Sequence, residues 1–187
     1  MSLLELLVAL ALLLILVGYI APSFAEWRSR QQLRGALRAL QLSVLKLRIA
    51  SLAAGRSHGL AFTLREGDLL WDTVVDGDGD GIRRSDLASG VDVPLEPERS
   101  LSAWFPGVRP GFPAGASPLA GGSPGEGGLA LGPSEILAAA PDGSTSSGTV
   151  YLYTESGYGA ALRVYGPTGR GTVWLWDPRH EKWTLLK

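Results

Sequence analysis

The residues best suited to chemistry lie in one short acidic segment, Asp76-Gly-Asp-Gly-Asp-Gly-Ile-Arg-Arg-Ser-Asp86. Its first three aspartates occupy alternate positions and Gly81 follows them. This is the pattern of the first half of an EF-hand-type loop, in which carboxylate oxygens converge on calcium and a glycine permits the sharp turn. A backbone carbonyl and a later carboxylate would complete the set. The predicted calcium ligands are therefore Asp76, Asp78, Asp80, Ile82 and Asp86.

The segment departs from the EF-hand pattern at its end. Asp86 is the eleventh residue, whereas the pattern places a bidentate Glu at the twelfth, where this chain has Leu87. The site would then be weaker, or completed from elsewhere by Asp92. The alternative is an acidic turn left in solvent. Three carboxylates without a cation repel one another, which slightly favours binding.

Glu5 is the second residue of unusual chemistry, because residues 6–21 after it contain no charged side chain. A carboxylate inside an apolar membrane segment costs roughly 3 kcal/mol unless it finds a partner or reaches the interface. Such an acid is by default a functional hypothesis. The structural alternative is a glutamate at the helix edge among lipid headgroups.

The remaining polar residues indicate no enzyme. His58 and His180 stand alone, cysteine is absent, and the sequence after His180 lacks the second His of a zinc helix. The run GSTSSG at 143–148 lacks the spacing of a nucleophile elbow. We therefore predict no catalytic residues and no enzyme activity. Trp174 and Trp176 share one face of a predicted strand, where core packing is expected, and an aromatic platform for a glycan or a base is the alternative.

The charge distribution separates the chain into two regions. Residues 1–56 carry seven basic residues against Glu5 and Glu26, a net charge of +5, and the remainder carries ten basic and sixteen acidic residues, a net charge of -6. The total of -1 argues against a bulk nucleic-acid binder. Without cysteine there is no disulfide framework.

One long helix is predicted to carry Glu5. Residues 1–25 form an apolar span of the roughly 20 residues that cross a bilayer. Residues 26–55 continue as an amphipathic helix with polar residues on one side, and Gly55 is the expected stop. Together they make a rod of about 75 to 80 Å, bent at Pro22. The apolar stripe of the second half consists of Leu33, Leu37, Leu40, Val44 and Leu47.

Residues 56–187 show short alternating runs separated by turn residues, which predict antiparallel strands. We expect an α+β fold in which the helix lies on one small antiparallel sheet, with residues 106–130 as a surface loop too rich in Gly and Pro for a core. The predicted strands are 59–64, 69–75, 91–95, 100–105, 148–154, 160–164, 172–177 and 182–186.

The N-terminal run Met1-Ser-Leu-Leu-Glu-Leu-Leu resembles the mature N-terminus of type IV pilins and type II secretion pseudopilins. The resemblance implies cleavage by a prepilin peptidase, methylation of the new amino terminus, and contact between Glu5 and the N-terminal amine of a neighbouring subunit. The family has Phe where this chain has Met1, and the leader is missing. Either the chain is the mature form or its start codon is placed too late.

The segment 76–86 and the run from Pro141 through Gly169-Arg170 to Trp176 look like the GspH/FimT group of minor pilins and pseudopilins. The resemblance implies a non-enzymatic subunit anchored once in the inner membrane, with its C-terminal domain in the periplasm. Its partners would be other pilin subunits in a filament, and the soluble domain would not form homo-oligomers. The basic residues after the span favour the opposite topology, which a basic leader would offset.

Two other functions remain open. The first is a DNA-binding minor pilin for DNA uptake, although such proteins carry Gly-Arg-x-Arg where this chain has Gly171-Thr172 after Arg170. The second is a membrane-anchored module that binds calcium or a glycan.

Overall fold

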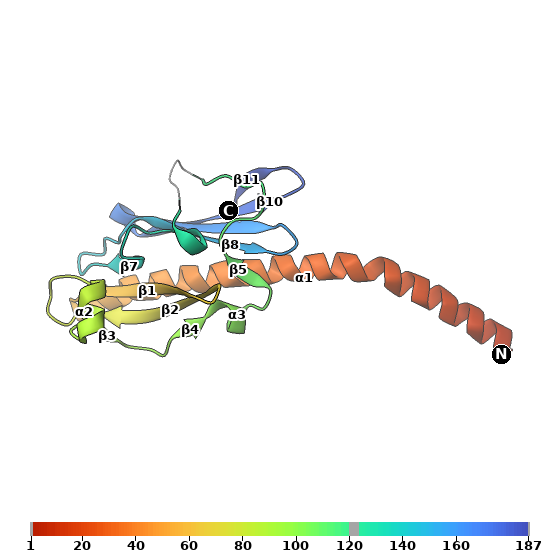
Figure 1. The fold of residues 1–187 in the computed structure, drawn as a ribbon, viewed down its shortest axis with the longest axis horizontal. Coiled ribbons are helices and arrows are strands. Elements are labelled where there is room, and N and C mark those ends of the chain that lie inside the picture. The colour runs from red at the N-terminus through yellow and green to blue at the C-terminus, as the bar shows by residue number, and fades with distance from the viewer. Residues whose placement is uncertain (1, 120–123, 187) are drawn as a thin grey trace.

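The computed structural model describes residues 2–119 and 124–186, and for residues 17–23 and 126 it describes the backbone alone. The long helix α1 (Leu3–Ala54) is flanked along its C-terminal part by two antiparallel sheets, and its N-terminal part extends away from them (Figure 1). The expected α+β class is confirmed. The expectation of a single sheet is wrong.

The ends of α1 are set by local residues. Ser2 is the N-cap, and its hydroxyl accepts from the Glu5 N–H at 3.2 Å. At the other end Gly55 adopts the left-handed conformation at φ 62°, and its N–H donates to the Ser51 carbonyl at 3.0 Å. The predicted stop at Gly55 is confirmed.

Figure 1 shows that α1 bends between its covered and uncovered parts. The side chain of Pro22 lies outside the described residues, so its role in the bend stays a prediction.

The predicted apolar stripe packs α1 against both sheets. Its five residues are at most 4% exposed, and Ala36 extends the buried arc sideways. This buried arc is wider than one stripe, so α1 contacts one sheet on each flank. The prediction of a single sheet was wrong because it assumed that only one side of the helix is covered. The stripe continues to Ser51, which is fully buried.

The five-stranded sheet has the order β3-β2-β1-β7, with β4 also paired to β2. The predicted strand 91–95 shrinks to two residues, and the predicted strand 100–105 is wrong. There the Ser100 hydroxyl accepts from the Ala103 N–H at 3.1 Å and caps a short helix, α3, whose Leu101 is buried. The strand β7 and the helix α2 (Arg84–Ser89) lie where the sequence analysis expected no element. The strands are β1 (His58–Arg65), β2 (Asp68–Val75), β3 (Val93–Pro94), β4 (Arg99–Ser100) and β7 (Ile136–Ala139), and α3 spans Leu101–Trp104.

The six-stranded sheet has the order β11-β10-β9-β8-β5, with β6 also paired to β8. The four strands predicted beyond residue 147 are all present, two of them longer than expected. Short 3-10 turns occur at Glu126–Gly128 and Gly166–Thr168. The strands are β5 (Val108–Pro110), β6 (Leu129–Ala130), β8 (Gly148–Thr154), β9 (Gly159–Tyr165), β10 (Arg170–Asp177) and β11 (Lys182–Leu186).

The Gly- and Pro-rich segment 106–130 is more than a surface loop, and that prediction is corrected. Val108 and Leu129 are buried in the main core, because β5 and β6 pair with β8 at its outer edge, where a proline such as Pro110 is tolerated. Residues 120–123 of this segment lie outside the described residues.

The part of this segment before residue 120 covers aromatic side chains of the six-stranded sheet. The ring centres of Phe112 and Tyr151 lie 4.2 Å apart, and the Trp183 indole N–H donates to the Ser117 carbonyl at 2.8 Å. Trp176 is buried with its ring 5.6 Å from that of Trp183, whereas Trp174 is half-buried. Core packing is therefore confirmed for Trp176, and the chain itself covers this aromatic surface.

Candidate functional site

The first feature with functional potential is the uncovered N-terminal half of α1. Each large apolar side chain described between Leu3 and Leu16 is more than half exposed. An apolar surface of this extent marks contact with a membrane or another protein. Among the residues described in full, no helix has the length and apolar character needed to cross a membrane.

Glu5 lies in this uncovered half and closes a capping box. Its N–H donates to the Ser2 hydroxyl, and its carboxylate accepts from the Ser2 N–H at 3.3 Å. A carboxylate in the first turn also interacts favourably with the helix dipole. The Ser-x-x-Glu spacing is a known helix-start signal that the sequence analysis overlooked. Met1, the predicted source of the N-terminal amine, lies outside the described residues.

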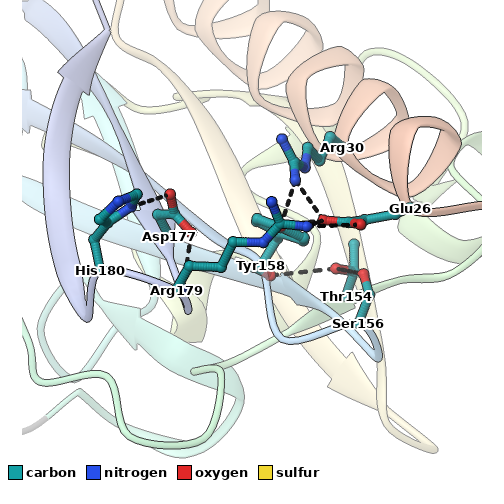
Figure 2. A network of polar contacts seen from close by, with 8 residues as sticks. All are labelled: Glu26, Arg30, Thr154, Ser156, Tyr158, Asp177, Arg179 and His180. Atoms are coloured by element: carbon teal, nitrogen blue, oxygen red, sulfur yellow. Dashed lines mark hydrogen bonds and ion pairs between the residues drawn. The ribbon is translucent and has the colours of Figure 1, made fainter. Parts of the chain in front are cut away.

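The second feature is a polar network where the covered part of α1 begins (Figure 2). Glu26 of α1 accepts hydrogen bonds from the Tyr158 hydroxyl and the Arg30 guanidinium. The Arg179 guanidinium, in the turn between β10 and β11, donates to the two carboxylate oxygens of Glu26 at 2.8 and 3.0 Å. The Arg30 guanidinium also lies 4.2 Å from the centre of the Tyr158 ring. We call Glu26, Arg30, Tyr158 and Arg179 the Glu26 clasp.

The electrostatics of the clasp favour an ionised Glu26. The Tyr158 hydroxyl and then Arg30 hold the pKa of Glu26 below its ordinary value, although burial opposes them. Burial, reinforced by the hydrogen bond to Glu26, raises the pKa of Tyr158. The clasp therefore joins α1 to two turns of the six-stranded sheet through charge-assisted hydrogen bonds.

Neighbouring polar residues hold the two turns in shape. Asp177 accepts from the Arg179 N–H at 2.9 Å, and its other carboxylate oxygen lies 2.7 Å from His180 Nδ1. The hydrogen bond from the Arg179 N–H, followed by the contact with His180, holds the pKa of Asp177 below its ordinary value. In the other turn the Thr154 hydroxyl contacts that of Ser156 at 2.9 Å (Figure 2).

Sequence reasoning missed the clasp. The spacing of four between Glu26 and Arg30 is a helix ion-pair signal that could have revealed one contact. Nothing local marks Tyr158 or Arg179, which lie 132 and 153 residues from Glu26.

The third feature is the aspartate loop, which we define as residues 76–83. The structure brings Asp76, Asp78 and Asp80 together, with one carboxylate oxygen from each within 4.8 Å of the others, so these residues could hold a metal ion. Asp80 also forms an ion pair with Arg83. Among the described residues, the group of converging carboxylates does not include Asp86.

Asp76 organises the loop from its buried base. Its carboxylate accepts from the Gly79 and Gly81 N–H groups at 2.6 and 3.0 Å. Burial acts to raise the pKa of Asp76, but these hydrogen bonds outweigh it and hold the pKa below its ordinary value. Hydrogen bonds within the loop therefore stabilise its shape, and Asp76 is both an acceptor of these bonds and a candidate metal ligand.

Asp92, considered as a completing ligand, instead anchors the loop. Its two carboxylate oxygens accept from the Gly77 and Arg83 N–H groups at 3.1 and 3.0 Å. The side chain of Ile82 packs beside the small cluster of Ala61, Val74 and Ile136, which fixes the far end of the loop. Ligation by the Ile82 carbonyl and by Asp86 stays a prediction.

No protein-family model matches the chain, and no curated protein matches it. Among solved structures it is similar to the minor pseudopilin EpsH from the type 2 secretion system of Vibrio cholerae, with a TM-score of 0.46 and 11% identity over 79% of this chain and 98% of that chain. A crystal structure of the minor pseudopilin EPSH from the type II secretion system of Vibrio cholerae matches with a TM-score of 0.41 and 9% identity, over 83% of this chain and 94% of that chain. Both likenesses concern the fold alone.

Proposed function

We propose that this chain is a non-enzymatic minor pilin or pseudopilin subunit of the GspH/FimT kind, which assembles into a type II secretion pseudopilus or a type IV pilus. The observation that carries the proposal is the apolar N-terminal half of α1, which no part of the described chain covers. In water such a surface would drive aggregation, so it needs a lipid or protein environment. Filament assembly supplies both in turn, first the membrane and then other helices.

The proposed mechanism is physical. The N-terminal half first anchors the chain once in the inner membrane with the β domain in the periplasm, and the chain is a substrate of a prepilin peptidase. During assembly the helix leaves the lipid and packs among the helices of neighbouring subunits. Glu5 then leaves its capping box and pairs with a neighbour's N-terminal amine, because two buried charges are tolerable only as a pair.

The rigid connection between helix and domain supports this role. The buried stripe and the Glu26 clasp both tie the β domain to α1, and the clasp sits where the uncovered half begins. A displacement of the helix therefore moves the whole domain, as an assembly subunit requires.

The test replaces Glu5 in the full-length chain. Glu5→Ala should abolish incorporation into filaments while leaving the thermal unfolding of the β domain unchanged, because Glu5 contacts only the first turn of α1. Glu155→Ala is the matched control, since it removes an exposed carboxylate of the β domain paired with Arg109. Incorporation of Glu5→Ala at the control level would refute the proposed role of Glu5.

A calcium ion in the aspartate loop is a second proposal, favoured by the three converging carboxylates. Calcium should raise the melting temperature of the full chain more than magnesium does, because Ca²⁺ accepts flexible oxygen ligands and Mg²⁺ demands octahedral geometry. The double variant Asp78→Asn and Asp80→Asn should lose the effect, and Asp142→Asn in a distant turn should retain it. Equal melting temperatures with calcium and with a chelator would refute the site.

A further inference from the structure

One side of α1 is basic where the helix passes the end of β10. Arg34, Arg38, Gln41, Leu45 and Arg48 recur at spacings of four, three, four and three, so they share one face of the helix. This face is about 21 Å long at the helical rise per residue. We call these five residues the basic stripe.

A groove lies between the basic stripe and the six-stranded sheet. One hollow of about 530 Å³ separates α1 from residues 168–171, and a second of about 440 Å³ continues it toward β11. Arg38 of α1 and Arg170 of β10 line both hollows, so the two adjoin. Each hollow exposes an apolar side chain, Leu45 at 51% in the first and Leu186 at 38% in the second. We call the joined hollows the arginine groove.

The positive charge of the arginine groove has no counter-charge within the described chain. No carboxylate lines either hollow among the described residues, whereas four arginines do, namely Arg34, Arg38, Arg48 and Arg170. None of the four forms an ion pair with a described residue. A cleft lined by one sign of charge attracts a ligand of the opposite sign. The groove is therefore suited to an anionic ligand.

The dimensions of the groove favour an extended peptide. Side chains on one face of a strand recur about every 6.6 Å, which is close to the rise of about 6 Å from Arg34 to Arg38. About six extended residues would cover the length of the basic stripe. Among the described residues, β11 pairs with β10 only from Val173 to Asp177, so residues 170–172 lie beyond the described part of β11. The edge of β10 in the groove is thus placed beside the path of such a peptide.

Two other classes of anionic ligand fit the groove less well. Single-stranded nucleic acid is held by aromatic side chains as well as by charge, and no aromatic ring lines either hollow among the described residues. Lipid headgroups form a layer of about 5 to 8 Å on each side of the hydrocarbon core. Arg38 lies about 20 Å along the helix axis beyond Ala25, the last residue of the apolar span, which is too far for headgroup contact.

We propose that the arginine groove binds an extended acidic peptide segment of a partner protein, about six residues long, in which carboxylates alternate with apolar side chains. The carboxylates pair with Arg34, Arg38 and Arg170 at the rim. The apolar side chains point the other way and lie against Leu45 and Leu186. This inference goes beyond the proposed function, because peptide binding requires no filament.

The first experiment measures binding of a defined peptide to the full-length chain in a zwitterionic detergent. The probe is a fluorescein-labelled peptide of sequence Glu-Leu-Glu-Leu-Glu-Leu, followed by fluorescence anisotropy at low salt. Its matched control is the isomer Glu-Glu-Glu-Leu-Leu-Leu, which has the same composition and charge but no alternation. The alternating peptide should bind about tenfold more tightly, a difference of about 1.4 kcal/mol. Equal affinities would show attraction by net charge alone and would overturn the proposal.

Charge reversals test whether the groove is the binding site. Arg38→Glu and Arg170→Glu should each weaken binding of the alternating peptide about tenfold. Both side chains are exposed, so the variants should keep the thermal unfolding of the unmodified chain, and Arg38→Gln and Arg170→Gln replace them if they do not. Arg163→Glu is the matched control, because Arg163 is exposed on β9 between the buried Leu162 and Val164 and so points away from α1. Unchanged affinity in both groove variants, or an equal loss in the control, would refute the site.

Thiol labelling locates the bound peptide, since the chain contains no cysteine. A bromoacetyl group on the alternating peptide should label Leu45→Cys about tenfold faster than Leu95→Cys. Leu95 is 53% exposed, as accessible as Leu45, but lies beside β2 of the other sheet. Equal labelling rates would contradict the proposed location.

Competition decides between the ligand classes. A DNA duplex or phosphatidylglycerol vesicles that bind more tightly than the alternating peptide, and lose this affinity in Arg38→Glu and Arg170→Glu, would assign the groove to that ligand and overturn the peptide proposal. Failure of either competitor to displace the peptide supports it. Filament incorporation of Glu5→Ala tests the proposed function separately, so the two can fail independently.

Discussion

Ser51→Ala probes the point where the end of α1 is tied to the five-stranded sheet. The Ser51 hydroxyl is fully buried, donates to the Ala139 carbonyl at 2.9 Å, and accepts from the His58 N–H at 3.2 Å. It also contacts the Leu47 carbonyl one turn back at 2.9 Å. One side chain thus connects α1, β7 and β1.

The magnitude follows from what Ser51→Ala leaves behind. A buried donor or acceptor that loses its partner costs about 1 to 3 kcal/mol, and two groups on different strands are affected. Ser51 is fully buried, so bulk water does not reach the two groups. We therefore expect a loss of about 3 kcal/mol in the free energy of unfolding, or about 6 to 12 °C in melting temperature for a chain of this size.

Ser43→Ala is the matched control. Ser43 is also a buried serine on α1, but its hydroxyl donates only to the Ala39 carbonyl of its own helix at 3.0 Å. Thermal and urea unfolding of the full chain should therefore show a change of less than about 0.5 kcal/mol for Ser43→Ala. Equal losses for the two variants would refute the reasoning that Ser51 acts through the strands.

Two further predictions concern the clasp and the aspartate loop. The pKa of Glu26 is held below its ordinary value of 4.5, so the clasp contributes stability above that value and loses it as the pH falls through the folded pKa. Proteolysis of α1 near the clasp should accelerate as the pH falls from 4.5 through the lowered pKa of Glu26, and Glu26→Gln should flatten this dependence. Gly77→Ala should unfold the aspartate loop, because an added Cβ would lie 1.9 Å from the Val91 carbonyl oxygen. Gly79→Ala, with open space around it but a φ of 89°, should cost only about 1 to 2 kcal/mol of backbone strain, and equal thermal losses would contradict the clash.

Features encoded by short spacings were predictable from the sequence. The repeat of three and four residues from Leu33 to Leu47 marks one face of a helix, and a glycine at 55 can adopt the left-handed cap. Asp76, Asp78 and Asp80 are close in the sequence, and the hydrogen bonds from the Gly79 and Gly81 N–H groups to Asp76 curve the loop that brings them together. The charge of Glu5 in an apolar run is visible without any fold. In each case the informative residues lie within a few positions of one another.

Features that join distant segments were decided only by tertiary structure. Glu26 meets Tyr158 and Arg179 because two sheet turns come to lie beside the same helix turn. Residues 106–130 hold strand residues because β8 offers an open edge there, and composition alone does not reveal an available partner. Leu42, Leu45, Ile49 and Leu52 stay exposed because the sheets pack on the other side of α1. Sequence spacing sets which side chains share a face, whereas the packing of distant segments decides which faces are covered and which stay free for another molecule.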